Sequence, residues 1–485
     1  MKPEEVKEKR PSVAASLTPF VLLAAMMVLV VKIFGADALG GASQVVLLLI
    51  SGVVIIIAMA FYRVPWKKIE SAIGENIHNV GSSIVILLFI GAIGGSWMIS
   101  GVVPTLIVYG LKVISPGIYL FAACIICALV SIMTGSSWAT VATLGVALIA
   151  IGQALGFSPA WCAGAIISGA YFGDKISPLS DTTVLASSIA GVPLFQHIRY
   201  MMITTGPAFA VALIIYLIFS ITHPAAGATE IAEVARVMRS TFNISPWLLV
   251  VPALTGVLIW RRVPAILTLM GAAVMASIVA LIAQPDLIVQ VAGAEGPLTF
   301  TSAFKGVLTM LATSTSIATG SESMDALVAT GGVNGMLPTI FLIISAATFG
   351  GTLVGSGMIH SLTEALVRRI SSRVGLVGAT LLTGVGSNLV MGDQYLSIIL
   401  PTRLYKELYE KLGYEGRLLS RSAEDSATIT SVLIPWNSCG MTQATVLHVP
   451  TISYMPFCFF NILSPIMSFI VAISGYKIKS NIKSK

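Results

Sequence analysis

The stretch that decides the fold reads Gly169-Ala-Tyr-Phe-Gly173-Asp174-Lys175-Ile-Ser177-Pro178-Leu-Ser180-Asp181-Thr182-Thr183. It places charges, hydroxyls and a proline inside an otherwise apolar segment. Pro178 has no amide hydrogen and frees a carbonyl about one turn earlier, and Gly173 permits the chain to turn. A carboxylate in a bilayer core costs about 2.5–3.5 kcal/mol and persists mostly where it lines a site. The stretch therefore predicts a membrane helix that is broken at a polar site.

A second stretch of the same kind lies near the C-terminus. It reads Ser420-Arg421-Ser422-Ala423-Glu424-Asp425-Ser426-Ala427-Thr428 and continues in Pro435-Trp436-Asn437-Ser438-Cys439-Gly440. Unwound backbone exposes carbonyls, and carboxylates beside them balance the charge of a hard cation such as sodium. The N-termini of the half-helices can also face an anionic group.

The composition places both stretches in a polytopic membrane protein. Of 485 residues, 56% are hydrophobic and 10% are charged, whereas a soluble domain has about 25% charged residues. Apolar stretches of roughly 17–25 residues recur along the chain, each long enough to span a bilayer. No phosphate-binding loop, nucleophilic triad or haem motif appears. We therefore expect an all-α membrane protein that is not an enzyme and needs no cofactor. The net charge of +7 calls for no nucleic acid, because Lys and Arg lie mainly between spans.

Three short matches indicate an internal repeat. Residues 94–101 resemble residues 350–357, 256 positions later. Gly135-Ser136-Ser137 resembles Gly386-Ser387-Asn388, and Asp174 with Ser177 resembles Asp425 with Thr428, each pair 251 positions apart (386 − 135 and 425 − 174). Matches in the same order at nearly one offset predict two copies of one membrane unit.

Loop charge predicts that the two copies are inverted. The connection at 152–160 is uncharged, but its counterpart at 403–421 carries Arg403, Lys406, Lys411, Arg417 and Arg421. By the positive-inside rule, equivalent loops then lie on opposite sides of the membrane. The predicted units are a cytoplasmic tail (1–14), a first membrane repeat (15–221), an extracytoplasmic linker (222–245), a second, inverted repeat (246–474) and a basic cytoplasmic tail (475–485). Both termini would be cytoplasmic, in a cell inner membrane.

Several positions have a second interpretation. Asp181 could pair with Lys175 as a structural bridge, Asp174 could be a loop residue at the cytoplasmic edge, and Arg421 could be a positive-inside anchor. Asp393 follows Gly392 and has no acidic partner in the first copy, where position 142 is Ala. That asymmetry favours a specific function such as proton carriage. The helix pairs at 118–155 and 374–410 could be full spans or re-entrant hairpins.

At these motifs the chain resembles the NhaC-type sodium/proton antiporter family, which belongs to the ion-transporter superfamily. The matching stretches are Gly135-Ser-Ser-Trp-Ala-Thr, the segment from Gly169 to Thr183, Gly392-Asp-Gln-Tyr, and the segment from Ser420 to Gly440. The resemblance implies an inverted-repeat transporter with re-entrant hairpins and broken helices. The hairpin tips would be Ser136-Ser137 and Ser387-Asn388. The breaks would centre on Asp174–Asp181 and Glu424–Asn437.

The function expected from this resemblance is exchange of sodium for protons. The expected ion-binding residues are Asp174, Asp181, Asp425, Ser136, Ser137, Ser177, Ser387, Asn388, Thr428 and Asn437, with sodium at Asp174 and Asp425. The candidates for proton coupling are Asp174, Asp393, Glu424 and Asp425. Because family members resemble exchangers of organic acids or carriers of amino acids as well, transport of a small carboxylate or amino acid, with Arg421 binding its carboxylate, is the alternative. Membrane lipid is an expected partner, and a homodimer is left open.

Overall fold

The computed structural model describes residues 10–34, 41–223, 228–261, 263–320, 324–325, 328–367, 370 and 372–478. Most of the two predicted tails lies outside these residues. In the part that is described, the chain is built from helices, and the only β pairing is an isolated bridge between Thr315 and Thr330.

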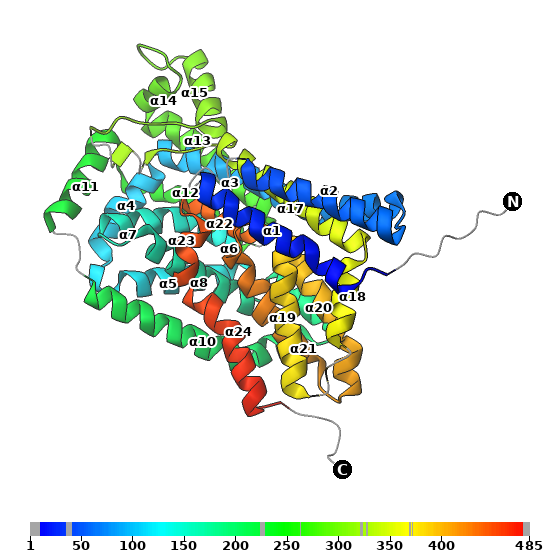
Figure 1. The fold of residues 1–485 in the computed structure, drawn as a ribbon. Helices are drawn as coiled ribbons and strands as arrows, with labels where there is room; N and C mark the ends of the chain where they lie inside the picture. The colour runs from blue at the N-terminus through cyan, green and yellow to red at the C-terminus, as the bar shows by residue number, and fades with distance from the viewer. Residues whose placement is uncertain are drawn as a thin grey trace.

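The first half of the chain runs from α1 to α10 (Figure 1). The bounds are α1 Val13–Phe34, α2 Ala42–Tyr62, α3 Trp66–Ile99, α4 Val102–Val113, η2 Pro116–Ile118, α5 Tyr119–Thr134, α6 Ser137–Thr140, η3 Val141–Gly145, α7 Val146–Ala154, α8 Pro159–Ile176, α9 Asp181–Ala190 and α10 Leu194–Thr222. Helix α11, Ala228–Thr241, lies in the predicted linker.

The second half runs from η4 to α24. The bounds are η4 Pro246–Leu249, α12 Val250–Trp260, α13 Ala265–Ala283, α14 Pro285–Val291, α15 Phe300–Ala312, η5 Asn334–Met336, α17 Leu337–Gly355, α18 Met358–Val367, α19 Arg373–Met391, α20 Gln394–Lys411, α21 Gly416–Ala423, η6 Glu424–Thr428, η7 Ser431–Leu433, α22 Ser438–Leu447, α23 Thr451–Tyr454, η8 Met455–Phe457 and α24 Phe459–Ser474.

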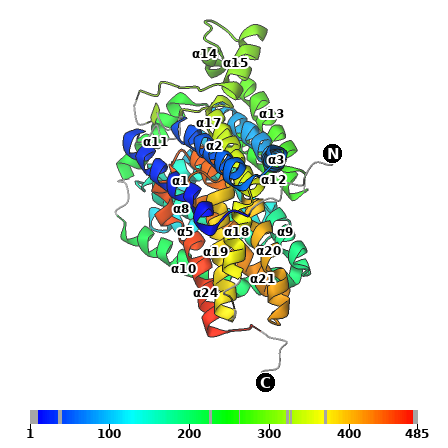
Figure 2. The same ribbon diagram turned by 45° about the vertical axis from the view of Figure 1, so that its right-hand side comes forward.

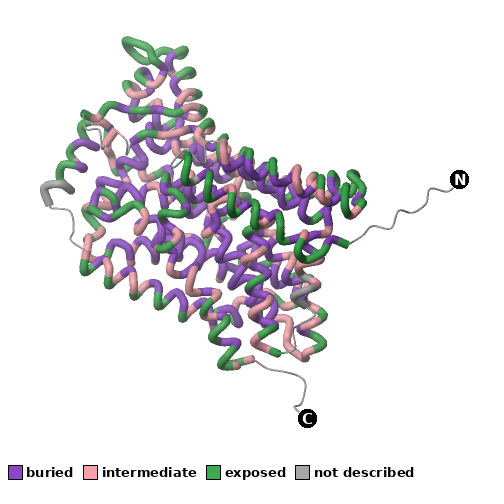
Figure 3. The backbone as a smooth tube through the Cα atoms, in the orientation of Figure 1, coloured by how far each residue is buried: buried purple, intermediate pink, exposed green. Residues whose placement is uncertain are grey.

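The outer helices present apolar side chains, as expected of a surface that faces lipid. Nine helices of the described residues are long and apolar enough to cross a membrane, or up to eleven if each of two bent pairs is one span. Ile56 on α2, Ile214 on α10 and Ile278 on α13 are more than half exposed. Figure 3 shows the buried residues gathered in the middle of the molecule, where many polar side chains also lie. The predicted all-α membrane class with broken helices is confirmed.

The two ends of the molecule differ in character. Helices α14 and α15 project from one end, and the last turn of α24 lies at the opposite end, beside α19 and α21 (Figures 1 and 2). Arg373 at the start of α19, Lys411 at the end of α20 and Lys477 after α24 all lie near that second end. These three residues define the basic end of the molecule.

The helices repeat along the chain, but in a different register from the one predicted. Left-handed backbone conformations recur at Gly135 and Gly392, at Gly156 and Gly413, and at Gly191 and His448, each pair 257 positions apart (392 − 135, 413 − 156, 448 − 191). Pro178 and Pro435 keep the same spacing. The predicted match of residues 94–101, at 256 positions, differs from this register by one residue. The two matches at 251 positions are wrong by six residues.

This register has consequences for the acidic residues. Gly386 lies inside α19, so Ser387 and Asn388 precede the hairpin turn at Gly392 and do not form the hairpin tip. The counterpart of Asp174 is Ser431, and the counterpart of Asp425 is Ser168. The two aspartates are therefore not equivalent positions of a repeat, because each copy carries its acid at a different level of its broken helix.

Candidate functional site

The first broken helix is joined to the first hairpin through Asp174. This residue lies in the last turn of α8 and is 5% exposed, so the interpretation as a loop residue at the membrane edge is wrong. Its Oδ2 accepts hydrogen bonds from the Ser137 backbone N–H at 3.1 Å and from the Ser137 hydroxyl at 2.7 Å. Its Oδ1 is buried and has no hydrogen-bond partner among the described residues.

The chain turns at Gly135 and Ser136, as predicted for the tip of this hairpin. Gly135 has φ 67°, and a Cβ there would lie 2.6 Å from the Leu179 carbonyl carbon in the break between α8 and α9. Only glycine therefore fits between tip and break. The Ser136 hydroxyl caps α6 by accepting from the Ala139 N–H at 3.2 Å. The Ser177 hydroxyl donates to the Ile132 carbonyl at 2.7 Å, which fastens the break to α5.

Gly173 has a role other than the predicted turn. It lies inside α8, where a Cβ would meet the Ala128 carbonyl oxygen at 2.3 Å, and Gly169 meets the Cys124 carbonyl oxygen at 2.0 Å in the same way. Two glycines four residues apart let the helix backbones approach closely, as is common in membranes. The pair packs α8 onto α5, and the chain breaks only at Ser177.

Lys175 joins the two broken helices. Its ammonium forms an ion pair with Oδ1 of Asp425, and both side chains are fully buried. It also donates to the Ser464 hydroxyl at 3.1 Å. The Thr204 hydroxyl donates to Oδ2 of Asp425 at 2.9 Å, and the Ser464 hydroxyl donates to Oδ1 at 3.2 Å. Both oxygens of Asp425 therefore have donors, contributed by α8, α10 and α24.

Asp181 does not pair with Lys175, so that structural bridge is wrong. Asp181 is the first residue of α9 and is exposed, and its Oδ2 accepts from the Tyr395 hydroxyl at 2.6 Å. Tyr395 is in the first turn of α20, directly after the second hairpin turn at Gly392 and Asp393. The contact links the first break to the second hairpin.

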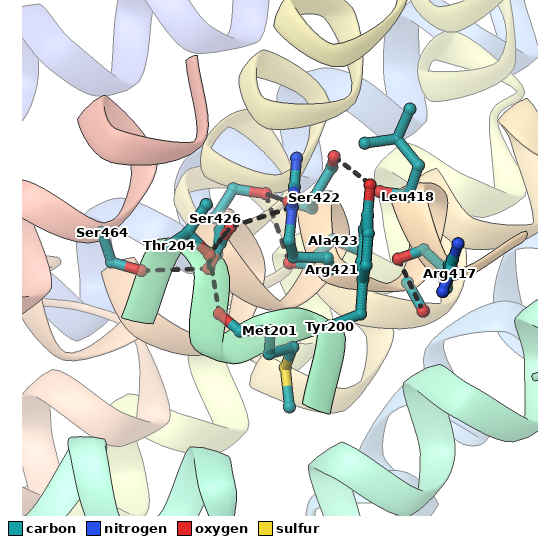
Figure 4. Close-up of polar contacts among 12 residues, drawn as sticks. Tyr200, Met201, Thr204, Arg417, Leu418, Arg421, Ser422, Ala423, Ser426 and Ser464 are labelled. Carbon is teal, nitrogen blue, oxygen red and sulfur yellow. Dashed lines mark hydrogen bonds and ion pairs between the residues drawn. The ribbon is translucent and has the colours of Figure 1, made fainter. Parts of the chain in front are cut away.

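Arg421 is fully buried, so it is not a surface anchor. Its Nε lies 3.9 Å from Oδ2 of Asp425. Its Cζ is 4.8 Å from the centre of the Tyr200 ring, and the Cζ of Arg417 is 4.7 Å from the same centre. Figure 4 shows the ring standing between the two guanidinium groups. None of the three guanidinium nitrogens of Arg421 has a hydrogen-bond partner among the described residues.

Glu424 and Thr428 bound a turn of π-helix, η6. Single π-helical turns are rare and occur often at functional sites. Glu424 is fully buried, and neither of its carboxyl oxygens has a hydrogen-bond partner within the described residues; the Thr428 hydroxyl has none either. The neighbouring Asp425 pairs with Lys175, and its Oδ2 lies 3.9 Å from Nε of Arg421. Two cations, Lys175 and Arg421, thus share one buried region with two acids, Glu424 and Asp425.

The second hairpin turns at Gly392 and Asp393. Gly392 has φ 61°, and Asp393 caps α20 through a bond from the Leu396 N–H to its Oδ1 at 2.9 Å. In the observed register Asp393 is the counterpart of Ser136, which caps α6 in the same way. Position 142 was the wrong counterpart, but Ser136 is not acidic either, so Asp393 again has no acidic partner in the first copy, and the structure gives it a capping role. Proton carriage by Asp393 stays a prediction.

Asn388 and Asn437 lie together at the second break. The Asn388 amide donates to the Ala427 carbonyl in η6 at 2.6 Å, and the Asn437 amide donates to the Asn388 carbonyl at 3.2 Å. Asn437 also caps α22. The Ser387 hydroxyl bonds only within its own helix, to the Thr383 carbonyl at 2.6 Å. Asn388 therefore belongs to the polar cluster although it is not at a tip.

A cavity of about 190 Å³ lies beside the first tip and the first break. Thr134, Ser136 and Thr143 supply hydroxyl groups from the hairpin, and Thr268 supplies one from α13. Leu179 from the break also lines it. The cavity thus gives a small hydrated species a polar surface next to Ser137, the residue that holds Asp174.

The donor set suits a hard cation at Asp174 better than at Asp425. In the described part of the chain no group of three His, Cys, Asp or Glu residues is arranged to hold a metal ion. Sodium, however, is bound through carboxylate, hydroxyl and carbonyl oxygens, as other hard cations are. Asp174 retains an oxygen without a hydrogen-bond partner among the described residues, and the Ser137 hydroxyl donates to its other oxygen. Asp425 already has Lys175 as its counter-charge.

Comparison with known proteins shows the family of this chain. The family model described as "Na+/H+ antiporter family" matches residues 9–193 and 169–476. The chain belongs to the Na+/H+ antiporter family. The Na(+)/H(+) antiporter NhaC of Alkalihalophilus pseudofirmus is 39% identical over 86% of this chain and 87% of that protein. The protein of the same name from Bacillus subtilis is 37% identical over 87% and 91%.

Another relative of this chain is named for a different exchange reaction. The malate-2H(+)/Na(+)-lactate antiporter of Bacillus subtilis is 34% identical over 84% of this chain and 85% of that protein. Membership in the Na+/H+ antiporter family is therefore compatible with cargo other than inorganic ions alone.

Several residues of the candidate site in this family member are not among those predicted from the sequence. Thr204 and Ser464 contact Asp425 but lie on α10 and α24, far from either broken helix in sequence. Tyr200 and Tyr395 were missed as well. A hydroxyl within an apolar helix is an ordinary feature, so no motif distinguishes Thr204 or Ser464. The repeat offers one signal, since Tyr395 follows the second tip directly.

Proposed function

We propose that this chain exchanges sodium for protons across the cell membrane. One observation carries the proposal: two consecutive residues at one helix break reach two different parts of the transporter. Asp174 accepts from Ser137 at the hairpin tip, and Lys175 pairs with Asp425 on the second broken helix. Occupancy of Asp174 is thereby coupled mechanically to an ion pair between the two copies.

Asp174 is the proposed residue for which sodium and protons compete. Its free oxygen Oδ1 and the hydroxyls around the neighbouring cavity are the ligand types that sodium prefers. A buried carboxylate without a cation or a proton is costly. The empty charged state therefore crosses the membrane slowly, and the loaded states cross faster. Exchange of one ion for the other follows from that difference.

The other acidic residues have supporting roles in this proposal. Asp425 supplies the counter-charge of Lys175 and is not the sodium ligand in the observed arrangement. Neither carboxyl oxygen of Glu424 has a hydrogen-bond partner among the described residues, and such surroundings tolerate the neutral, protonated form. Glu424 is therefore the proposed second proton carrier, ahead of Asp393, whose Oδ1 caps a helix.

The orientation follows from charge. The basic end formed by the start of α19, the end of α20 and the residues after α24 would face the cytoplasm, with both termini on that side. The cell membrane supplies the surrounding lipid. Assembly of two protein chains into a homodimer stays a prediction.

The test uses purified protein in liposomes with a trapped pH-sensitive dye. Sodium added to one side should move protons in the wild-type protein. Asp174→Asn keeps the shape and removes the charge, so it should abolish this signal. Asp181→Asn is the matched control, because Asp181 is exposed and bonded to Tyr395, and it should retain most of the signal. Full sodium-dependent proton movement by the Asp174→Asn protein would refute the proposal.

A second candidate function is exchange of a small carboxylate. The observation that favours it is the buried guanidinium of Arg421, whose nitrogens have no hydrogen-bond partner in the described structure. Arginine binds carboxylates through two parallel hydrogen bonds. The relative that exchanges malate and lactate supports the same alternative.

The two candidates differ in one measurable quantity. Radiolabelled lactate or malate should exchange across liposomes that contain the protein only if the second candidate is correct. Arg421→Lys should then reduce that uptake strongly, because lysine lacks the forked geometry. Sodium-driven proton movement that added carboxylates do not change would exclude the second candidate and support the first.

A further inference from the structure

A separate cavity of about 350 Å³ opens at the basic end of the molecule, apart from the ion site described above. It is lined by Phe195, Gln196, Arg199, Tyr200, Ile203, Arg417 and Lys477. These residues come from the first turns of α10, from α21 and from the segment after α24. Three of them are cationic, and they come from three separate parts of the chain.

The charges in this cavity are only partly balanced. Arg417 is paired with Glu415. In the described structure no carboxylate lies within ion-pair distance of Arg199 or Lys477, and both residues are exposed. The sequence after residue 478 contains three lysines and no acid. Three cations against one acid leave the cavity with an excess of about two positive charges.

Of the remaining lining residues, Gln196 is polar and the other three are apolar or aromatic. Phe195 is 72% exposed, and Ile203 lies two turns further along α10. A cavity with cationic and apolar walls at a membrane surface matches a molecule with an anionic head and an acyl chain. Basic pockets between membrane helices on the cytoplasmic side are known to bind lipid head groups. A free anion would use the cations but would gain nothing from Phe195.

We propose that this cavity binds the phosphate of an anionic phospholipid from the cytoplasmic leaflet. The phosphate oxygens accept hydrogen bonds from Arg199, Arg417 and Lys477, and the acyl chain passes along Phe195 and Ile203. The site does not depend on the proposed ion exchange, because none of the three cations contacts Asp174, Lys175 or Asp425.

The site also has a physical link to the transport region. Tyr200 forms one wall of the cavity, and its ring separates Arg417 from the buried Arg421 (Figure 4). The Tyr200 hydroxyl donates to the Lys477 carbonyl at 3.3 Å. A bound phosphate therefore holds α10, α21 and the segment after α24 together next to the residues that surround Asp425.

The test measures lipid retention by native mass spectrometry of the full-length protein in detergent. Phosphatidylglycerol and phosphatidylcholine with the same acyl chains are titrated separately. The wild-type protein should retain one phosphatidylglycerol in preference to phosphatidylcholine. Arg199→Gln/Lys477→Gln should weaken that retention about twenty-five-fold, at roughly fivefold for each basic residue near an anionic surface.

The control removes the same charge outside the cavity. Lys112 and Lys411 are exposed and do not line it, so Lys112→Gln/Lys411→Gln should retain phosphatidylglycerol as the wild-type protein does. Equal retention of both lipids by the wild-type protein would overturn the proposal, and this arm needs no variant to fold. Unchanged retention by the Arg199→Gln/Lys477→Gln protein would also overturn it. Displacement of the lipid by millimolar inorganic phosphate would show a site for free anions instead.

Discussion

Lys175 is the residue whose removal should most disturb the folded protein. It is fully buried and its charge is balanced by Asp425, with hydroxyl donors completing the shell of the carboxylate. Loss of one partner of a buried pair leaves an uncompensated charge and costs about 3–5 kcal/mol, whereas loss of both partners is often nearly neutral.

We therefore expect Lys175→Met to lower the thermal stability of the detergent-solubilised protein markedly. The double variant Lys175→Met/Asp425→Leu should recover most of that loss, because neither member of this pair is then left without the other. Melting followed by size-exclusion chromatography measures both. Lys411→Met, which breaks only an exposed pair with Glu407, should change little. A double variant less stable than the single one would contradict this interpretation of the pair.

A second prediction at the scale of single residues concerns the hydroxyl group of Ser137. It donates to Asp174 at 2.7 Å, next to the backbone N–H of the same residue. A hydrogen bond to a charged group contributes about 1.5–3 kcal/mol. Ser137→Ala should therefore raise the KM for sodium roughly tenfold or more while the maximal rate is largely kept.

Its control is Ser51→Ala. The Ser51 hydroxyl bonds only to the Leu47 carbonyl of its own helix, so this variant should transport sodium as the wild-type protein does. An unchanged KM in the Ser137→Ala protein would show that the backbone N–H alone positions the carboxylate.

At the scale of elements, the two glycines near the second hairpin distinguish the observed register from the one suggested by sequence. Gly392 has a left-handed backbone, and a Cβ there would lie 2.7 Å from the Cβ of Ala346. Gly386 is inside α19, and a Cβ there would have nothing within 4 Å. The same substitution should therefore have opposite effects at the two positions.

Gly392→Ala should destabilise the protein, since a left-handed residue with a side chain costs about 1–2 kcal/mol before any clash. Gly386→Ala should stabilise it slightly, by about 0.5–1 kcal/mol, because alanine is favoured in a helix interior. Thermal melting in detergent compares them directly. Destabilisation by Gly386→Ala with tolerance of Gly392→Ala would support the register of 251 positions.

At the scale of the whole molecule, the opposite orientation of the two copies is the main prediction. Gln153 and Lys411 are exposed and precede Gly156 and Gly413, which are equivalent in the observed repeat. If the copies are inverted, these two positions lie on opposite faces of the membrane. The difference in basic residues between the two connections is the basis for this expectation.

Cysteines introduced by Gln153→Cys and Lys411→Cys should therefore differ in their reaction with a membrane-impermeant maleimide. In intact cells Gln153→Cys should be labelled, and Lys411→Cys should be labelled only after the membrane is opened. The five native cysteines are all buried, so the wild-type protein serves as the unlabelled background. Labelling of both positions from the same side would contradict inversion.

Much of the architecture follows from the sequence alone, because its causes are local. Apolar length determines which segments cross the membrane, Pro178 and Pro435 mark the two breaks, and Gly135 with Ser136 marks the first tip. These features depend on a missing amide hydrogen, a left-handed backbone or the solubility of a helix in lipid. The importance of Asp174 follows from the same reasoning, since a carboxylate in an apolar helix needs a partner.

The tertiary structure alone decided which partner each charge has. Lys175 lies six residues from Asp181 but pairs with Asp425, 250 positions away, because packing of α8 against α10 and α24 brings them together. Contacts between distant segments likewise decided the register of the second hairpin, because short Gly-Ser motifs recur by chance. Of Gly386 and Gly392, only Gly392 has a left-handed backbone. Contacts between distant segments depend on how side chains fill space in three dimensions, and spacing along a single chain does not encode them.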